Sequence, residues 1–292
     1  MKIYYTIFII ILIISSCTEV IDLELNTSEN NKLVVEGSIT TEQKSHTVKL
    51  SRTTDYFSNQ ATPKELGAKL SISDDENIFY LTDDDNDGIY ITDENVKGQA
   101  GKTYRLDIEL ENGEKYFAES FLKPIFPMDS LKYEYKKSDF PFDENYYYSI
   151  YLYVQEPPSI GDYYQWELYI NGIHDSDTLR NKTIVSDEMV NGVYISKWPV
   201  YVIPDYKILN DTNMVKIQML SISKEAYDFE LALILETDYS GSNFSGPPAN
   251  IPTNISNGAL GFFSASDIVE DSIEVYYKKN VNSNKKISSK LK

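Results

Sequence analysis

The chain has 292 residues, with 27 Lys and Arg against 45 Asp and Glu, so its formal net charge is −18 at pH 7. A face that binds nucleic acid needs clustered positive charge to meet the phosphates, and this excess of acid argues against such a partner. Cys17 is the only cysteine, which excludes an internal disulfide, so packing must hold the folded parts together.

The first sixteen residues have the pattern of a secretory signal peptide. Lys2 supplies the positive start, and Ile3 to Ile14 form an apolar run. At helical rise this run covers about 18 Å, which is shorter than the roughly 30 Å hydrocarbon core of a membrane. Small residues then precede Cys17, as in a bacterial lipobox. We therefore expect residues 1–16 to be removed and Cys17 to carry the acyl chains of a lipid anchor.

Residues 17–31 are polar and acidic, and we expect them to form a tether between the lipid and the first domain. An alternative interpretation is an export signal to the cell surface, carried by Glu19, Asp22 and Glu24. These three acids are spread along the tether rather than clustered, and both interpretations stay open.

Residues 32–124 alternate between apolar and polar side chains in seven short segments. The segments are rich in Val, Ile, Tyr and Thr, and turn-forming residues separate them: 32–40, 46–53, 68–73, 77–82, 88–92, 103–110 and 115–122. This spacing of short strands is typical of a β-sandwich. We predict an immunoglobulin-like β-sandwich domain over residues 32–124.

The stretch from Asp83 to Glu94 matches the spacing of a calcium-binding EF-hand loop. An EF-hand requires a helix on each side of that loop, and both flanks here have the alternation of strands. The stretch therefore predicts a β-hairpin with a solvated acidic turn at residues 86–88. An incidental calcium site formed by Asp83, Asp85 and Asp87 is the alternative, because three close carboxylates repel one another unless a cation neutralises them.

Residues 125–279 are predicted to form a second, mostly-β domain, after the boundary segment 122–130 with its two prolines. Strand patterns resume at residue 130 and continue to the end of this region. A single long helix is predicted from Ser223 to Tyr239, with Ser223 as its N-cap. The lysine-rich segment 280–292 has no apolar pattern, and we expect it to be a disordered tail.

The sequence contains no motif of a known catalytic site. There is no G-x-S-x-G, Walker, H-E-x-x-H or C-x-x-C pattern. His46 and His174 fall in different predicted domains, and each is interpreted as a surface or turn histidine. We therefore expect a non-enzymatic protein with no cofactor. A glycan or peptide hydrolase that uses two carboxylates stays open, because such a pair needs no local motif.

Aromatic residues indicate where a partner or ligand could bind. Residues 146–153 contain five tyrosines at the positions of a predicted strand, whose alternate side chains face opposite ways. One face would fill the core, and the other would present a tyrosine row. The long loop 240–258 is a second candidate surface. The candidate contact residues are Tyr147, Tyr151, Tyr153, Tyr163, Tyr164, Trp166, Asn254, Asn257 and Phe262.

The layout resembles an uncharacterised lipoprotein family of Bacteroidota, domain of unknown function 4249. The resemblance rests on the lipobox cysteine, "LVVEGSIT", "GQAGKTYRLDIELENGEKYFAES", "GDYYQWELYING" and "NIPTNISNGALGFFSAS". It implies an outer-membrane lipoprotein with an immunoglobulin-like first domain and a second mostly-β domain. Genes of this family often lie beside TonB-dependent receptors, and the family lends no catalytic residues.

Taken together, these observations predict a lipid-anchored binding or accessory module of the outer membrane, on its periplasmic or outer face. A TonB-dependent transporter is its expected partner. A structural or adhesive surface protein is the first alternative, and the hydrolase is the second.

Overall fold

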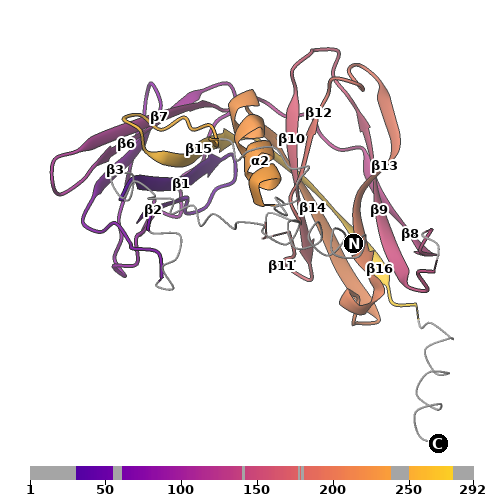
Figure 1. Ribbon diagram of the computed structural model, residues 1–292. Helices are drawn as coiled ribbons and strands as arrows, with labels where there is room; N and C mark the ends of the chain where they lie inside the picture. Colours follow the sequence, from indigo (N-terminus) through magenta and orange to yellow (C-terminus); the bar gives the residue numbers. More distant parts are fainter. Residues whose placement is uncertain are drawn as a thin grey trace, which may run out of the picture.

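A computed structural model describes residues 31–54, 61–139, 142–176, 178, 181–237 and 250–278. Within them the protein is mostly β, as the sequence predicted, and has one α-helix, α2. Two β-halves lie on either side of this helix (Figure 1). No helix among these residues is long and apolar enough to cross a membrane. The signal segment, Cys17, the tether and the lysine-rich tail lie outside the described residues, apart from Asn31 at the end of the tether.

The first half consists of two four-stranded sheets that share one core. One sheet has the order β15-β1-β2-β5 and the other has the order β4-β3-β6-β7. The first contains β1 (Leu33–Thr40), β2 (Thr47–Arg52), β5 (Ile89–Ile91) and β15 (Leu260–Ser266). The second contains β3 (Lys69–Ser73), β4 (Ile78–Leu81), β6 (Thr103–Glu109) and β7 (Lys115–Phe121). All seven strands predicted between residues 32 and 124 are confirmed.

Strand alternation builds this first core. In β6, Tyr104, Leu106 and Ile108 point inward and are buried, while the residues between them are only partly buried. Period-two placement of apolar residues gives each strand one buried face, and facing sheets then share the core. Val35 on β1 and Phe263 on β15 belong to the same buried cluster.

The second half also packs two sheets around a core. A three-stranded sheet has the order β13-β9-β8, from β8 (Ser130–Lys137), β9 (Tyr146–Gln155) and β13 (Tyr194–Pro204). The facing sheet has the order β11-β10-β14-β16, with β12 paired to β10. Its strands are β10 (Tyr163–Ile170), β11 (Ile173–His174), β12 (Thr183–Ser186), β14 (Thr212–Ile222) and β16 (Ile268–Tyr276). A short 3-10 helix, η3 (Asp205–Lys207), follows β13.

The helix α2 spans Lys224–Thr237 and begins where the sequence predicted. The side chain of Ser223 accepts a hydrogen bond from the backbone N–H of Ala226, at 3.1 Å. That bond satisfies one of the free N–H groups of the first turn, so Ser223 is the N-cap. Because β14 ends at Ile222, the chain passes from strand to helix through this single residue.

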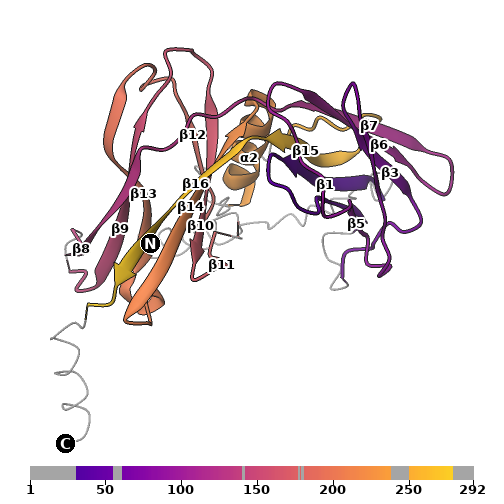
Figure 2. The same ribbon diagram turned by 180° about the vertical axis from the view of Figure 1, so that it is seen from behind.

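The last two strands join the halves. β15 pairs in parallel with β1 of the first half, and after Asp267 the chain continues as β16, which pairs with β14 of the second half. Figure 2 shows this crossing from behind. Residues 125–279 were predicted to lie together in the second domain, and β15 corrects that division: Phe263 and Ala265 lie in the first core. Strand pairing between residues so far apart in the chain leaves no local signal.

Candidate functional site

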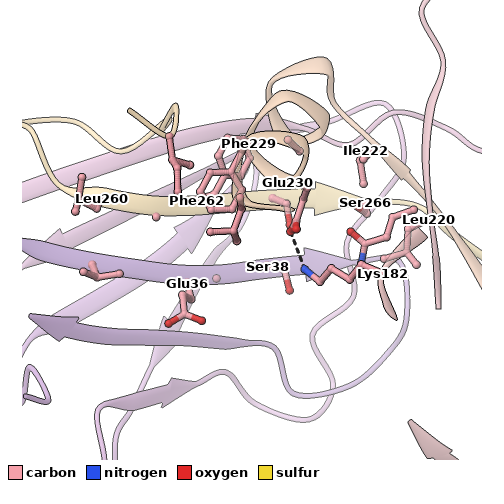
Figure 3. A pocket seen from close by; sticks show the side chains of 18 of the residues that line it. Glu36, Ser38, Lys182, Leu220, Ile222, Phe229, Glu230, Leu260, Phe262 and Ser266 are labelled. Atoms are coloured by element: carbon pink, nitrogen blue, oxygen red, sulfur yellow. Dashed lines mark hydrogen bonds and ion pairs between the residues drawn. The ribbon is translucent and has the colours of Figure 1, made fainter. Parts of the chain in front are cut away.

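A cavity of about 1040 Å³ lies at the junction of the two halves. Ligand pockets commonly measure about 300–1,000 Å³ and occur preferentially between domains. Strands β1 and β15 form its floor, β10 and β14 contribute a wall, and α2 covers it (Figure 3). Residues 238–249, which follow α2, lie outside the described residues.

The floor is the outer face of the first sheet. On β1, Leu33, Val35 and Ile39 are buried in the core, and the alternate residues Val34, Glu36, Ser38 and Thr40 line the cavity. On β15, Leu260, Phe262, Ser264 and Ser266 line the cavity in the same way. The two strands are in register, with Ser38 opposite Ser264. The period of two therefore builds a core on one side of the sheet and an amphipathic floor on the other.

Three side-chain contacts join α2 to the rest of the cavity. Phe229 stacks on Phe262 of β15, with ring centroids 5.1 Å apart. Tyr227 lies against Tyr163 of β10, with ring centroids 5.0 Å apart. Glu230 forms an ion pair with Lys182, which precedes β12, with 2.8 Å between Oε1 and Nζ. The helix is thus held by two aromatic contacts and one charged contact, and Figure 3 shows Phe229 beside Phe262 and Glu230 paired with Lys182.

The walls mix apolar and charged groups. Leu220, Ile222 and Leu233 supply apolar surface. Glu167 on β10 accepts hydrogen bonds from Gln165 Nε2 and from Tyr169 Oη, both at 3.0 Å. Burial, followed by the charge of Glu167, raises the pKa of Tyr169, so this hydroxyl stays protonated and remains a donor. Such a lining fits a ligand with an apolar body and hydrogen-bonding groups.

The predicted tyrosine row of β9 is largely covered. Tyr151 is buried, and the ammonium of Lys197 on β13 lies 5.0 Å from its ring centroid. Lys132 on β8 covers Tyr153 in the same way at 4.6 Å. Tyr147 donates its hydroxyl to Asp143 at 3.0 Å. Lysines on both neighbouring strands thus occupy the ring faces that a partner would contact.

The other predicted aromatic residues lie in different places. Tyr163 is half-buried against α2, and Tyr164 and Trp166 are buried. Tyr164 donates its hydroxyl to Glu156 at 2.8 Å. The indole N–H of Trp166 has no hydrogen-bond partner within the described part of the chain. Tyr164 and Trp166 therefore belong to the second core and are not available to a partner at the surface.

Among the candidates near the loop 240–258, only Phe262 lines the cavity. Asn254 instead donates to the carbonyl groups of Glu119 and Phe263, at 3.1 and 2.8 Å, and accepts from the N–H of Phe263 at 3.0 Å. Asn257 donates to the carbonyl of Lys115 at 2.6 Å. The two asparagines attach residues 254–257 to β7 and β15, which is a structural task.

The acidic hairpin has the predicted strand–turn–strand form. Both oxygens of Asp83 accept backbone N–H groups, from Asp87 and Gly88, at 3.0 Å each. Asp87 accepts the N–H of Ile89 at 2.8 Å. Two of the three proposed calcium ligands thus stabilise the turn itself. Asp83, Asp85 and Asp87 do not form a ligand group of three within the described residues.

A different cluster of three carboxylates is buried in the second half. Ligand oxygens of Glu156, Asp162 and Asp187 lie within 4.8 Å of one another. Lys123 forms an ion pair with Asp162 at 2.6 Å, and both oxygens of Asp187 accept the N–H of Gly161. Burial, and then the charges of Asp162 and Asp187, raise the pKa of Glu156. Three carboxylates could hold a cation, but the ammonium of Lys123 already occupies one side of this group.

The two histidines do not meet. His46 was predicted to lie at the surface or in a turn, and that prediction is wrong. Its side chain is buried beside the carbonyl of Val96, 3.3 Å from Nε2, and burial lowers its pKa. His174 stacks on Tyr169 with ring centroids 4.7 Å apart. His46 falls on the same side of the alternating segment 46–53 as the buried Val48 and Leu50, and its polarity alone suggested a surface position.

The cavity residues Lys182 and Glu230 were not predicted from the sequence. They lie on separate elements, and no spacing connects them. Alternation could have indicated Glu36 and Ser38 as outward residues of β1, but it does not show that β14 and α2 cover that face. Cys17, the predicted lipidation site, lies outside the described residues.

The family described as "Domain of unknown function (DUF4249)" matches residues 18–272, which include every strand up to β15 and most of β16. No curated protein matches the chain.

Proposed function

We propose that this chain, which belongs to the DUF4249 family, is a lipid-anchored binding module of the outer membrane. The ligand is a small amphipathic molecule held in the junction cavity. The module acts without catalysis, as an accessory that captures the ligand for a TonB-dependent transporter. The first domain serves as an immunoglobulin-like support for the cavity floor.

One observation carries the binding role: the cavity of about 1040 Å³ between β1, β15, β10, β14 and α2. Its lining combines an aromatic pair and aliphatic side chains with many polar and charged groups, so it suits a ligand that has both apolar surface and hydrogen-bonding groups. The position supports the same role, since both halves contribute walls. The lipid anchor rests on the lipobox at Cys17, and the transporter partner rests on the family resemblance.

The first test is purification from native outer membranes in detergent, with a tag after Lys292. Mass spectrometry identifies both the small molecules and the proteins that copurify. We expect a small amphipathic compound and a stoichiometric TonB-dependent barrel. Recovery of the protein alone, or bound only to extracellular polymer, would refute the transporter role and leave the adhesive alternative.

A variant that fills the cavity localises the ligand. Ser264 lies on the cavity floor, so Ser264→Trp places an indole where the ligand binds. Ser272→Trp is the matched control, because Ser272 is exposed on β16 and outside the cavity. We expect the compound to be lost from Ser264→Trp and retained by Ser272→Trp. Equal retention by both would place the ligand elsewhere.

A further inference from the structure

The helix that covers the cavity is weakly held along its second half. Of the 14 residues of α2, only Ala226 is buried. Leu231 and Leu235 are 36% and 62% exposed, and Leu233 and Ile234 are only partly buried. Isolated helices of this length are marginally stable in water, so packing must supply most of the stability of α2. That packing is concentrated in the first two turns.

The start of the helix, by contrast, is firmly attached. Ile222 at the end of β14 and Ala226 in the first turn are both 4% exposed, and they form one buried cluster with Phe262. Ser223 between them caps the helix. A rotation of the helix about this point would keep the cap and the buried cluster, and would move residues 229–237 away from the floor.

Beyond the first turn, the helix is held over the cavity by the Phe229–Phe262 stack and by the ion pair between Lys182 and Glu230. Their side chains are 25% and 15% exposed, so the pair is substantially desolvated. The second oxygen of Glu230, Oε2, is buried without a hydrogen-bond partner among the described residues. A buried carboxylate oxygen without a donor raises the free energy of the closed arrangement. The Coulomb attraction is therefore partly offset, and the difference in free energy between closed and open is reduced.

From these contacts we propose that α2 is a hinged cover of the junction cavity, pivoting at Ser223–Ala226 and held shut by the Lys182–Glu230 ion pair. The inference rests on the proposed function, because a ligand of the cavity is what the opening admits. Phe229 moves with the cover and leaves Phe262, so an open helix exposes an aromatic floor to an apolar ligand. Lys182 and Glu230 are positioning residues: they set how often the cavity opens.

Hydrogen exchange tests the cover without any ligand. Lys182→Met removes the ammonium and retains the aliphatic length. We expect amide exchange in residues 229–237 to accelerate about tenfold, the change that corresponds to losing roughly 1.4 kcal/mol from the closed state. Exchange in β14 should stay unchanged, which separates local opening from global destabilisation. The matched control is Asp228→Asn, which removes an exposed ion pair to Lys224 on the same helix.

A reversible cross-link tests whether the helix must move for a ligand to enter. In the full chain with Cys17→Ser, Lys182→Cys and Glu230→Cys supply the only thiols, and a short bis-maleimide with an internal disulfide joins them. The probe is the fluorescent dye 1-anilinonaphthalene-8-sulfonate. We expect the cross-linked protein to take up the dye at least about tenfold more slowly than the open double variant, and reduction to restore the rate.

The two experiments separate the hinge from the binding role. Dye uptake at an unchanged rate in the cross-linked protein would overturn the hinge, and so would exchange in residues 229–237 that Lys182→Met leaves unaltered. Dye binding that Ser264→Trp does not reduce would count against the cavity as the binding site. The exchange result would still decide whether α2 opens.

Discussion

At the scale of single residues, Gly261 decides how closely β15 can approach β1. Its φ is +91°, and a Cβ there would lie 2.0 Å from the carbonyl oxygen of Val35. No side chain can occupy that position without separating the two strands. The pairing of β15 with β1 therefore depends on a glycine that lies more than 200 residues after β1 in the chain.

We expect Gly261→Ala to abolish or severely weaken folding of the first half. Gly113→Ala is the matched control: its φ is +86°, but no atom lies within 4 Å of the added Cβ, so it pays only the conformational cost of about 1–2 kcal/mol. Urea unfolding followed by circular dichroism measures both. Equal effects of the two substitutions would contradict the close approach of β15 to β1.

The buried carboxylates predict a pH dependence of stability with a definite sign. The pKa of Glu156 is raised above its usual value of 4.5, so the folded state retains its proton to higher pH than the unfolded state does. Glu156 therefore stabilises the folded state at pH values below its pKa in the unfolded chain. This stabilisation is lost as the pH rises through its pKa in the folded protein. We expect the free energy of unfolding of Glu156→Gln, relative to the wild type, to increase from pH 4 to pH 8.

Glu270 supplies the opposite sign as a control. Hydrogen bonding by Gln218, and then by Lys216, lowers its pKa. Glu270 therefore stabilises the folded state at pH values above its pKa in the unfolded chain, and this stabilisation is lost as the pH falls through its pKa in the folded protein. Because Glu270→Gln lacks this contribution, its free energy of unfolding relative to the wild type should decrease as the pH rises. Urea titrations at several pH values measure both differences. Slopes of the same sign for the two variants would refute the assignment at Glu156.

At the scale of elements, a single side chain connects β7, β15 and the segment that precedes β15. Asn254 makes three hydrogen bonds to the backbone of Glu119 and Phe263. Amide side chains can donate and accept at once, and this one satisfies backbone groups on two strands. The asparagines that resembled contact residues in the sequence are thus parts of the strand framework.

We expect Asn254→Ala to destabilise the protein by about 1–3 kcal/mol, because the N–H and carbonyl groups of the buried Phe263 lose their partners. Asn257→Gly keeps the backbone conformation at φ +57° accessible, removes one exposed hydrogen bond to Lys115 and should cost less. Urea unfolding provides the values, and ligand content after purification provides a second readout. A loss of ligand from Asn254→Ala with unchanged stability would restore Asn254 as a contact residue.

At the scale of the whole molecule, Asp267 lies at the joint between the halves. Its Oδ1 accepts the hydroxyl of Thr41 at 2.6 Å, and its Oδ2 accepts the N–H of Ile125 at 3.0 Å. Thr41 follows β1 and Ile125 lies in the segment between β7 and β8. One carboxylate therefore ties the crossing between β15 and β16 to the end of β1 and to the segment that links the two halves.

We expect Asp267→Ala to uncouple the unfolding of the two halves. Both tryptophans, Trp166 and Trp198, pack in the second core, so their fluorescence reports that half alone, while circular dichroism reports both. The two signals should coincide in the wild type and separate in the variant. Asp271→Ala is the control, because the Asp271 carboxylate accepts the N–H of its neighbour Ser272 within β16. If the fluorescence and circular dichroism transitions still coincide in Asp267→Ala, the Asp267 carboxylate does not couple the unfolding of the two halves.

The local elements were determined by the sequence itself. Alternation in segments such as 103–110 specified the strands of the first half, and Ser223 before an apolar helical run specified α2. These features depend on neighbours within a few residues, because side-chain period and capping act over that distance. The acidic hairpin at 83–94 was likewise predictable, since strand patterns on both sides exclude the helices of an EF-hand.

Only the tertiary structure decided what these elements form together. Val35 meets Gly261, Glu230 meets Lys182, and Glu156 meets Asp187 across long stretches of chain that carry no periodic signal. The cavity forms because β15 pairs with the first sheet, while α2, which follows β14 of the second half, lies over the outer face of that sheet. The packing also decided the place of single residues. His46, Tyr164 and Trp166, predicted to lie at the surface, are buried, and Phe262 lines the cavity. Local patterns determine an element, and packing between distant elements determines a site.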